Sequence, residues 1–108
     1  MKIKFLATGI APERYEFEGE KVIFNGEVFD LSMFEEGDVF EEIEGDIQAI
    51  RAVERIDGEL HVTLCQRAPA GHWTGIGDYI DSNEYDPNTL YIRKKTPEEI
   101  QEVAGWGI

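Results

Sequence analysis

The chain has 108 residues, of which 42% are hydrophobic and 11% aromatic, a length and a content of core-forming side chains that exclude disorder of the whole chain. Its 23 acidic residues outnumber its 10 basic residues, and the formal net charge of −13 disfavours direct binding to nucleic acid or to anionic membranes. We therefore expect one domain over residues 1–108, whose charge serves solubility, a basic protein partner or mimicry of a polyanion.

The N-terminus has no signal-peptide hydrophobic region, and no stretch approaches the roughly 20 apolar residues of a membrane span. We therefore expect a cytoplasmic protein. Cys65 is the only cysteine, so the chain forms no internal disulfide. It lies in the apolar run Leu60–Cys65, which indicates a buried structural thiol rather than a nucleophile.

The first thirty residues predict a succession of short strands. Lys2–Leu6 alternates apolar and polar side chains, and we expect this strand to end near Gly9. A turn at Glu18-Gly19-Glu20 then leads into Lys21–Phe24. Asn25-Gly26 follows, between segments rich in β-branched and aromatic residues, and it predicts a type I′ hairpin because both residues accept a positive φ.

The segment Ser32–Asp46 differs from its neighbours because it concentrates acids around Gly37 and Gly45. A short helix and a loop with one helical turn are equally compatible with its apolar residues. We interpret the segment as a candidate contact surface for a basic protein partner. Its acidic residues are Glu35, Glu36, Asp38, Glu41, Glu42, Glu44 and Asp46.

A second hairpin is predicted at Asp57-Gly58, between Ile47–Ile56 and Glu59–Gln66. Apolar and polar side chains alternate along the second arm of this hairpin, Glu59–Gln66. Its inward side chains are Leu60, Val62 and Leu64, and its outward side chains are His61 and Thr63.

Residues Ala68–Asn88 are rich in Gly, Pro, Asp and Asn, and they predict a long surface loop pinned by aromatic side chains, with a strand near Tyr79-Ile80. Trp73 either tucks under this loop as a plug or is a further candidate protein contact, because exposed aromatic side chains on loops often anchor interfaces. The acids and amides of Asp78–Asn88 offer oxygen ligands to Ca²⁺, but they lack the order of a calcium-binding loop. We leave a weak site there open.

The end of the chain predicts a short strand at Leu90–Ile92 and then a helix. Thr96 is a suitable N-cap, Pro97 fits the first helical position, and Glu99 completes a capping box. We expect Gly105 to end this helix and its apolar face to dock on the sheet.

The sequence supports no catalytic, cofactor or metal site. A zinc ion could in principle recruit His61, Cys65 and His72, but no short-spaced ligand pair is present. On an extended strand His61 and Cys65 lie about 13 Å apart, too far for His61 to accept the proton of a thiol nucleophile, which leaves only His72 of the long loop as a base. We therefore expect a protein that is not an enzyme.

The two hairpins carry a resemblance. Val22–Ser32, with its Asn-Gly-Glu turn, and Val53–Leu64, with its Glu-Arg-Ile-Asp-Gly-Glu-Leu turn, resemble a loose group of small phage and prophage proteins of uncharacterised function. The likeness covers roughly residues 20 to 66. It implies a phage-encoded accessory protein in the host bacterial cytoplasm, and it supplies no catalytic residues.

Together these patterns predict a β-rich α+β fold: an antiparallel meander of about six strands with β-hairpins and a short C-terminal helix. The leading functional hypothesis is a non-enzymatic module that binds another protein through the acidic segment and Trp73. The alternative is an acidic inhibitor that mimics nucleic acid and blocks a host DNA- or RNA-binding protein. Homo-oligomers through a free sheet edge stay open.

Overall fold

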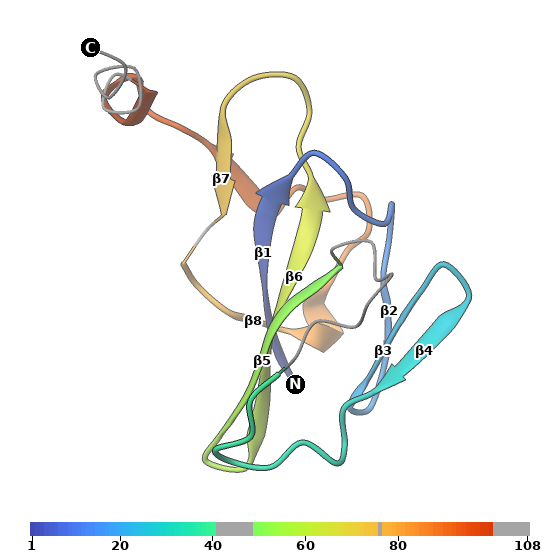
Figure 1. Ribbon diagram of the computed structural model, residues 1–108. Helices are drawn as coiled ribbons and strands as arrows, with labels where there is room; N and C mark the ends of the chain where they lie inside the picture. Colours follow the sequence, from blue (N-terminus) through green and yellow to red (C-terminus); the bar gives the residue numbers. More distant parts are fainter. Residues whose placement is uncertain (41–48, 76, 101–108) are drawn as a thin grey trace.

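A computed structural model describes residues 1–40, 49–75 and 77–100. Within these residues, nine short strands form three small sheets, and one 3₁₀ turn follows the eighth strand (Figure 1). The strands are β1 (Lys2–Thr8), β2 (Glu16–Glu18), β3 (Lys21–Phe24), β4 (Glu27–Asp30), β5 (Ile50–Ile56), β6 (Glu59–Arg67), β7 (Trp73–Gly75), β8 (Ile80–Asp81) and β9 (Ile92–Lys94).

The largest sheet has the strand order β5-β6-β1-β8. Its N-terminal strand β1 runs parallel to β6, with Lys2 opposite His61 and Thr8 opposite Arg67, and it pairs antiparallel with β8. The expected β-rich fold is confirmed, but the expected simple meander of six strands is wrong. Turn chemistry reports only the pairing of neighbouring strands, and a parallel partner remote in sequence leaves no such local signal.

Both predicted hairpins are confirmed. Asn25 and Gly26 have φ angles of 52° and 76°, and Asp57 and Gly58 have φ angles of 50° and 82°, so both central residues of each turn are left-handed, as in a type I′ turn. The first turn joins β3 to β4 and the second joins β5 to β6. The alternation of β6 is also confirmed, since Leu60, Val62 and Leu64 are all buried in the core. On the outward face of β6, Thr63 is nonetheless covered by its neighbours.

A second sheet, with the order β2-β3-β4, stands beside the first (Figure 1). Its first turn has Gly19 at a φ of 60°, as the Glu-Gly-Glu pattern predicts. Aromatic rings join the two sheets: the Tyr15 ring lies 6.0 Å from that of Phe5 and 5.7 Å from that of Phe24, centroid to centroid. The buried Tyr15 hydroxyl also donates to the Cys65 carbonyl of β6.

The described residues between 68 and 94 are more regular than the loop predicted for Ala68–Asn88. β7 pairs with β9 in a separate two-stranded sheet, β8 extends the largest sheet, and Ser82–Glu84 forms a 3₁₀ turn. The predicted strand near Tyr79-Ile80 is thus present as β8, whereas the final strand begins two residues later than expected, at Ile92. Gly75 is required where β7 crosses β1, because a Cβ there would lie 2.4 Å from the Phe5 carbonyl oxygen.

The predicted helix starts as expected. Its described part runs from residue 97 to residue 100. The Thr96 N–H donates to Glu99 Oε1 (3.0 Å) and the Glu99 N–H donates to Thr96 Oγ1 (3.3 Å), which is the reciprocal pattern of a capping box. The predicted stop at Gly105 lies outside the described residues.

Candidate functional site

The acidic segment begins where β4 ends, and we call its described part, residues 31–40, the acidic loop. Its first residue Leu31 is 9% exposed and belongs to the core. The Leu31 N–H donates to the Glu20 carbonyl (2.9 Å), and the Phe34 N–H closes a turn on the Leu31 carbonyl (3.0 Å). Hydrogen bonds from the side chain and the backbone of Ser32 hold the pKa of Asp30 below its ordinary value. The loop therefore leaves the sheet in a fixed direction.

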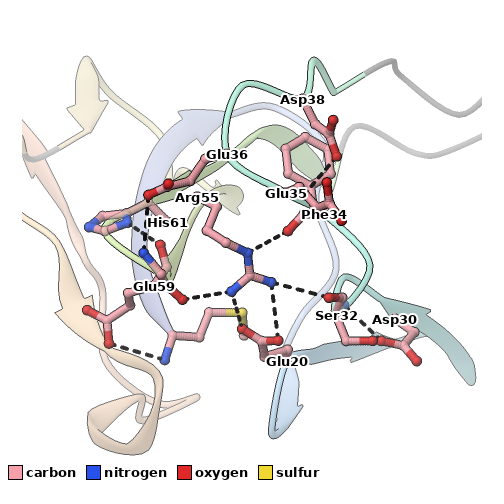
Figure 2. Close-up of polar contacts among 12 residues, drawn as sticks. Glu20, Asp30, Ser32, Phe34, Glu35, Glu36, Asp38, Arg55, Glu59 and His61 are labelled. Carbon is pink, nitrogen blue, oxygen red and sulfur yellow. Dashed lines mark hydrogen bonds and ion pairs between the residues drawn. The ribbon is translucent and has the colours of Figure 1, made fainter.

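Arg55 of β5 holds the loop from the other side (Figure 2). Its Nε donates to the Phe34 carbonyl, and its Nη2 donates to the Ser32 carbonyl (3.3 Å). Its Nη1 donates to the Gly58 carbonyl in its own hairpin (2.8 Å). One half-buried guanidinium thus ties the acidic loop to the tip of the β5–β6 hairpin.

The same guanidinium makes a two-pronged ion pair with Glu20, at 2.9 Å and 3.2 Å (Figure 2). Glu20 lies in the turn between β2 and β3. The hydrogen bond to Glu20 raises the pKa of Arg55 above its ordinary value. Because the fork of an arginine matches a carboxylate in only one plane, this pair fixes orientation as well as distance. Arg55 therefore links the second sheet, the acidic loop and the β5–β6 hairpin.

Two of the predicted acidic residues stabilise the loop itself. Glu36 Oε1 accepts from the Gly58 N–H (3.2 Å), and Asp38 Oδ2 accepts from the Glu35 N–H (2.7 Å). A backbone bond from the Asp38 N–H to the Glu35 carbonyl (3.1 Å) closes the same turn. Glu35, Glu36 and Asp38 all remain exposed to solvent, so the loop presents a concentrated negative charge on a defined backbone.

Two apolar side chains stand among these acids. Met33 is 86% exposed and Val39 is 83% exposed, the highest values for large hydrophobic side chains in the described part of the chain. Behind Val39, a shallow cleft of about 290 Å³ lies between residues 38–40 and residues 51–54 of β5. This arrangement can bind a surface that combines apolar side chains with basic ones, because each exposed apolar group gains by leaving water.

The predicted contact residues do not all meet at this surface. Glu35, Glu36 and Asp38 lie in the acidic loop, whereas Glu41, Glu42, Glu44 and Asp46 lie outside the described residues. Trp73 belongs to β7, near the far end of β1 from the acidic loop (Figure 1). Its ring is half-buried, its Nε1 donates to the Ala70 carbonyl (3.4 Å), and Lys94 Nζ lies 5.6 Å from the ring centroid. The structure therefore separates Trp73 from the acidic contact surface.

Three of the residues considered as metal ligands, Cys65, Asp81 and Asp86, have partners within the chain. Cys65 is buried, and its Sγ accepts a hydrogen bond from Arg51 Nε (3.3 Å). In the Asp78–Asn88 segment, Asp81 caps the 3₁₀ turn through the Asn83 N–H (3.0 Å), and Asp86 accepts from the Asn88 N–H (2.9 Å). Among residues 1–40, 49–75 and 77–100, no three His, Cys, Asp or Glu side chains are placed together to hold a metal ion.

Two features of the acidic loop were not predicted from the sequence. The exposure of Met33 and Val39 was not predicted, because the sequence left a short helix and a loop equally open over Ser32–Asp46 and so defined no outward face. The role of Arg55 had a usable signal: it occupies an inward position next to Val53 on an alternating strand, where a charged residue needs an acceptor nearby. The partner itself, Glu20, is distant in sequence and could not be identified from that pattern.

No protein-family model, curated protein or solved structure matches this chain. Its function therefore has to be inferred from its own residues. In the part of the chain that the structure describes, no helix has the length and apolar character needed to cross a membrane.

Proposed function

We propose that this chain is a non-enzymatic protein-binding module, a phage or prophage accessory protein of the host cytoplasm, whose acidic loop contacts a partner with basic and apolar residues. The observation that carries the proposal is the exposure of Met33 and Val39 on a loop that Arg55 holds at its base. The likeness of the two hairpins to small phage and prophage proteins supports the accessory role.

Physical arguments favour a protein partner. Large apolar side chains that stay in water gain free energy when a partner covers them, at about 25 cal/mol per Å². The hydrogen bonds of Arg55 and Glu36 fix the loop before binding, so less conformational entropy is lost on association. Surrounding carboxylates increase the rate of encounter with a basic surface and disfavour acidic partners.

The nucleic-acid-mimic alternative fits the described part of the loop less well. A phosphate mimic needs carboxylates that are free to replace phosphate oxygens at the host protein. Glu36 and Asp38 each have one carboxylate oxygen engaged by a backbone N–H of the chain, so these two acids keep only part of their acceptor capacity for a host protein. A mimic also gains nothing from the exposed Met33 and Val39 side chains.

The test is site-specific photo-crosslinking in an extract of the host bacterium. A photoreactive residue is placed at Met33 and, in a matched control, at Ile10, which is also exposed (64%) but lies outside the acidic loop. The proposal predicts a discrete protein crosslink from position 33 that position 10 does not give. Crosslinks of equal yield from both positions would contradict a specific surface.

Salt and competition then separate the two functions. Binding through apolar side chains persists at high ionic strength and is weakened by Met33→Ala. Binding by mimicry is lost steeply as salt rises, is displaced by DNA and is insensitive to Met33→Ala. This second set of results would replace the proposed function with the inhibitor.

A further inference from the structure

A second surface, separate from the acidic loop, lies at the free edge of β4. β4 is the outer strand of the sheet with the order β2-β3-β4, and Figure 1 shows no described element beyond it. A free edge presents unpaired backbone N–H and C=O groups, which are a template for an additional strand. The direction of those groups can be deduced from the register.

The two-residue turn makes Phe24 and Glu27 a hydrogen-bonded pair, and pairs alternate along an antiparallel ladder. The next pair, Ile23 and Val28, is therefore not hydrogen-bonded, and the alternation continues from there to Lys21 and Asp30. The bond from the Leu31 N–H to the Glu20 carbonyl (2.9 Å) agrees with this phase. The backbone N–H and C=O of Val28 and Asp30 consequently point away from β3, toward the free edge.

The side chains along this edge have a distinct chemistry. Val28 is 58% exposed, and it shares a face of the sheet with the half-buried Ile23 opposite it. Glu27 and Asp30 flank Val28 and Phe29, and both carry an exposed carboxylate. The edge thus combines an apolar centre with an acid at each end.

We propose that the β4 edge binds an extended basic segment of a partner protein as an added antiparallel strand. The partner strand pairs with the outward backbone groups of β4. In this register a basic residue lies opposite Asp30, a β-branched residue opposite Val28 and a second basic residue opposite Glu27. The residue opposite Phe29 can be of any type. Val28 then exchanges two backbone hydrogen bonds with the β-branched residue. Opposite charges across the pair add stability.

Charge complementarity excludes a second copy of this chain as the preferred occupant. Pairing of two β4 strands would gather two Glu27 and two Asp30 carboxylates on adjacent strands, and β4 has no basic side chain to offset them. Each copy would also carry the net charge of −13, and long-range repulsion would slow the encounter. A basic strand of a partner protein avoids both the like charges on adjacent strands and the long-range repulsion.

The test uses the peptide acetyl-Thr-Lys-Thr-Val-Lys-Thr-amide and the full chain labelled with ¹⁵N. We expect saturable shifts of the Val28 and Asp30 amide signals. N-methylation of the peptide valine removes the N–H that faces Val28 and should weaken binding about fivefold or more. Replacing both lysines by glutamate should abolish binding. Equal binding of the N-methylated peptide would show that charge alone is responsible and would overturn strand addition.

Protein variants provide the matching control. Val28→Pro removes the outward donor without removing a bond to β3, whereas Val28→Thr keeps it, so only Val28→Pro should weaken peptide binding. The N-methylated peptide keeps the proposal testable if Val28→Pro fails to fold. Met33→Ala should bind the peptide like the original chain, so this test succeeds or fails independently of the proposed function. Shifts confined to residues 33–39 would contradict the proposal.

Discussion

Leu31 and Met33 make a sharp test of how the acidic loop is built, because they lie two residues apart and have opposite environments. Leu31 is 9% exposed and Met33 is 86% exposed. Leu31→Ala should lower the free energy of unfolding by about 2–4 kcal/mol, the cost of a lost core side chain and the cavity left behind. Met33→Ala removes a side chain that stands in water, and the change should stay within about 0.5 kcal/mol.

Urea denaturation and thermal melting measure both changes. At about 4–8 °C per kcal/mol for a small domain, Leu31→Ala should lower the melting temperature by at least about 8 °C, while Met33→Ala should leave it nearly unchanged. The two variants should rank the other way round in their effect on partner binding. Loss of the Met33 contact area should weaken the affinity about fivefold to thirtyfold. If Met33→Ala destabilised the protein as strongly as Leu31→Ala, Met33 would be a core residue and the argument for a displayed loop would be wrong.

Three further predictions concern the contacts that hold the fold and the loop. Arg55→Lys removes the planar guanidinium that bonds to Glu20 and to the carbonyls of the acidic loop, so the amides of this loop should exchange with solvent faster. Unchanged hydrogen–deuterium exchange would refute the role of Arg55. Tyr15→Phe should destabilise the protein by about 1 kcal/mol in urea denaturation, because it removes the buried hydroxyl that donates to the Cys65 carbonyl and lies 3.5 Å from the Ala49 carbonyl. Hydrogen bonds from Arg93 and Thr96 lower the pKa of Glu99 from 4.5 to about 2. The contribution of Glu99 to the stability of the helix cap should therefore be complete above pH 4.5 and lost as the pH falls through about 2. Titration of the Glu99 carboxyl carbon by NMR measures this pKa.

Local structure was predictable wherever a short motif carries its own physical reason. Asn25-Gly26 and Asp57-Gly58 demand positive φ angles, and Thr96 with Glu99 forms a self-contained cap. The burial of Leu60, Val62 and Leu64 on β6 follows from the alternation of apolar and polar residues along this strand. These features depend on residues a few positions apart, so the sequence alone defines them.

Topology and the contact surface depend on residues far apart in the chain. The parallel pairing of β1 with β6 and the pairing of β7 with β9 carry no turn signal. Glu35, Glu36 and Asp38 were identified from charge density, but their presentation depends on the bonds between Arg55 and Glu20, 35 residues apart. Trp73 was expected either as an exposed contact or as a plug beneath its loop, and its strand pairing with Lys94 could not be deduced from a stretch that reads as a loop.

The most direct measurement for the proposed function compares how strongly the crosslinked partner binds to three forms of the chain. These are the original sequence, the double variant Met33→Ser with Val39→Ser, and the control Ile10→Ser, all checked for equal thermal stability. We expect the original chain and Ile10→Ser to bind the partner with the same affinity, and the double variant to bind at least tenfold more weakly. Equal affinity for all three forms would contradict the claim that the acidic loop is the binding surface.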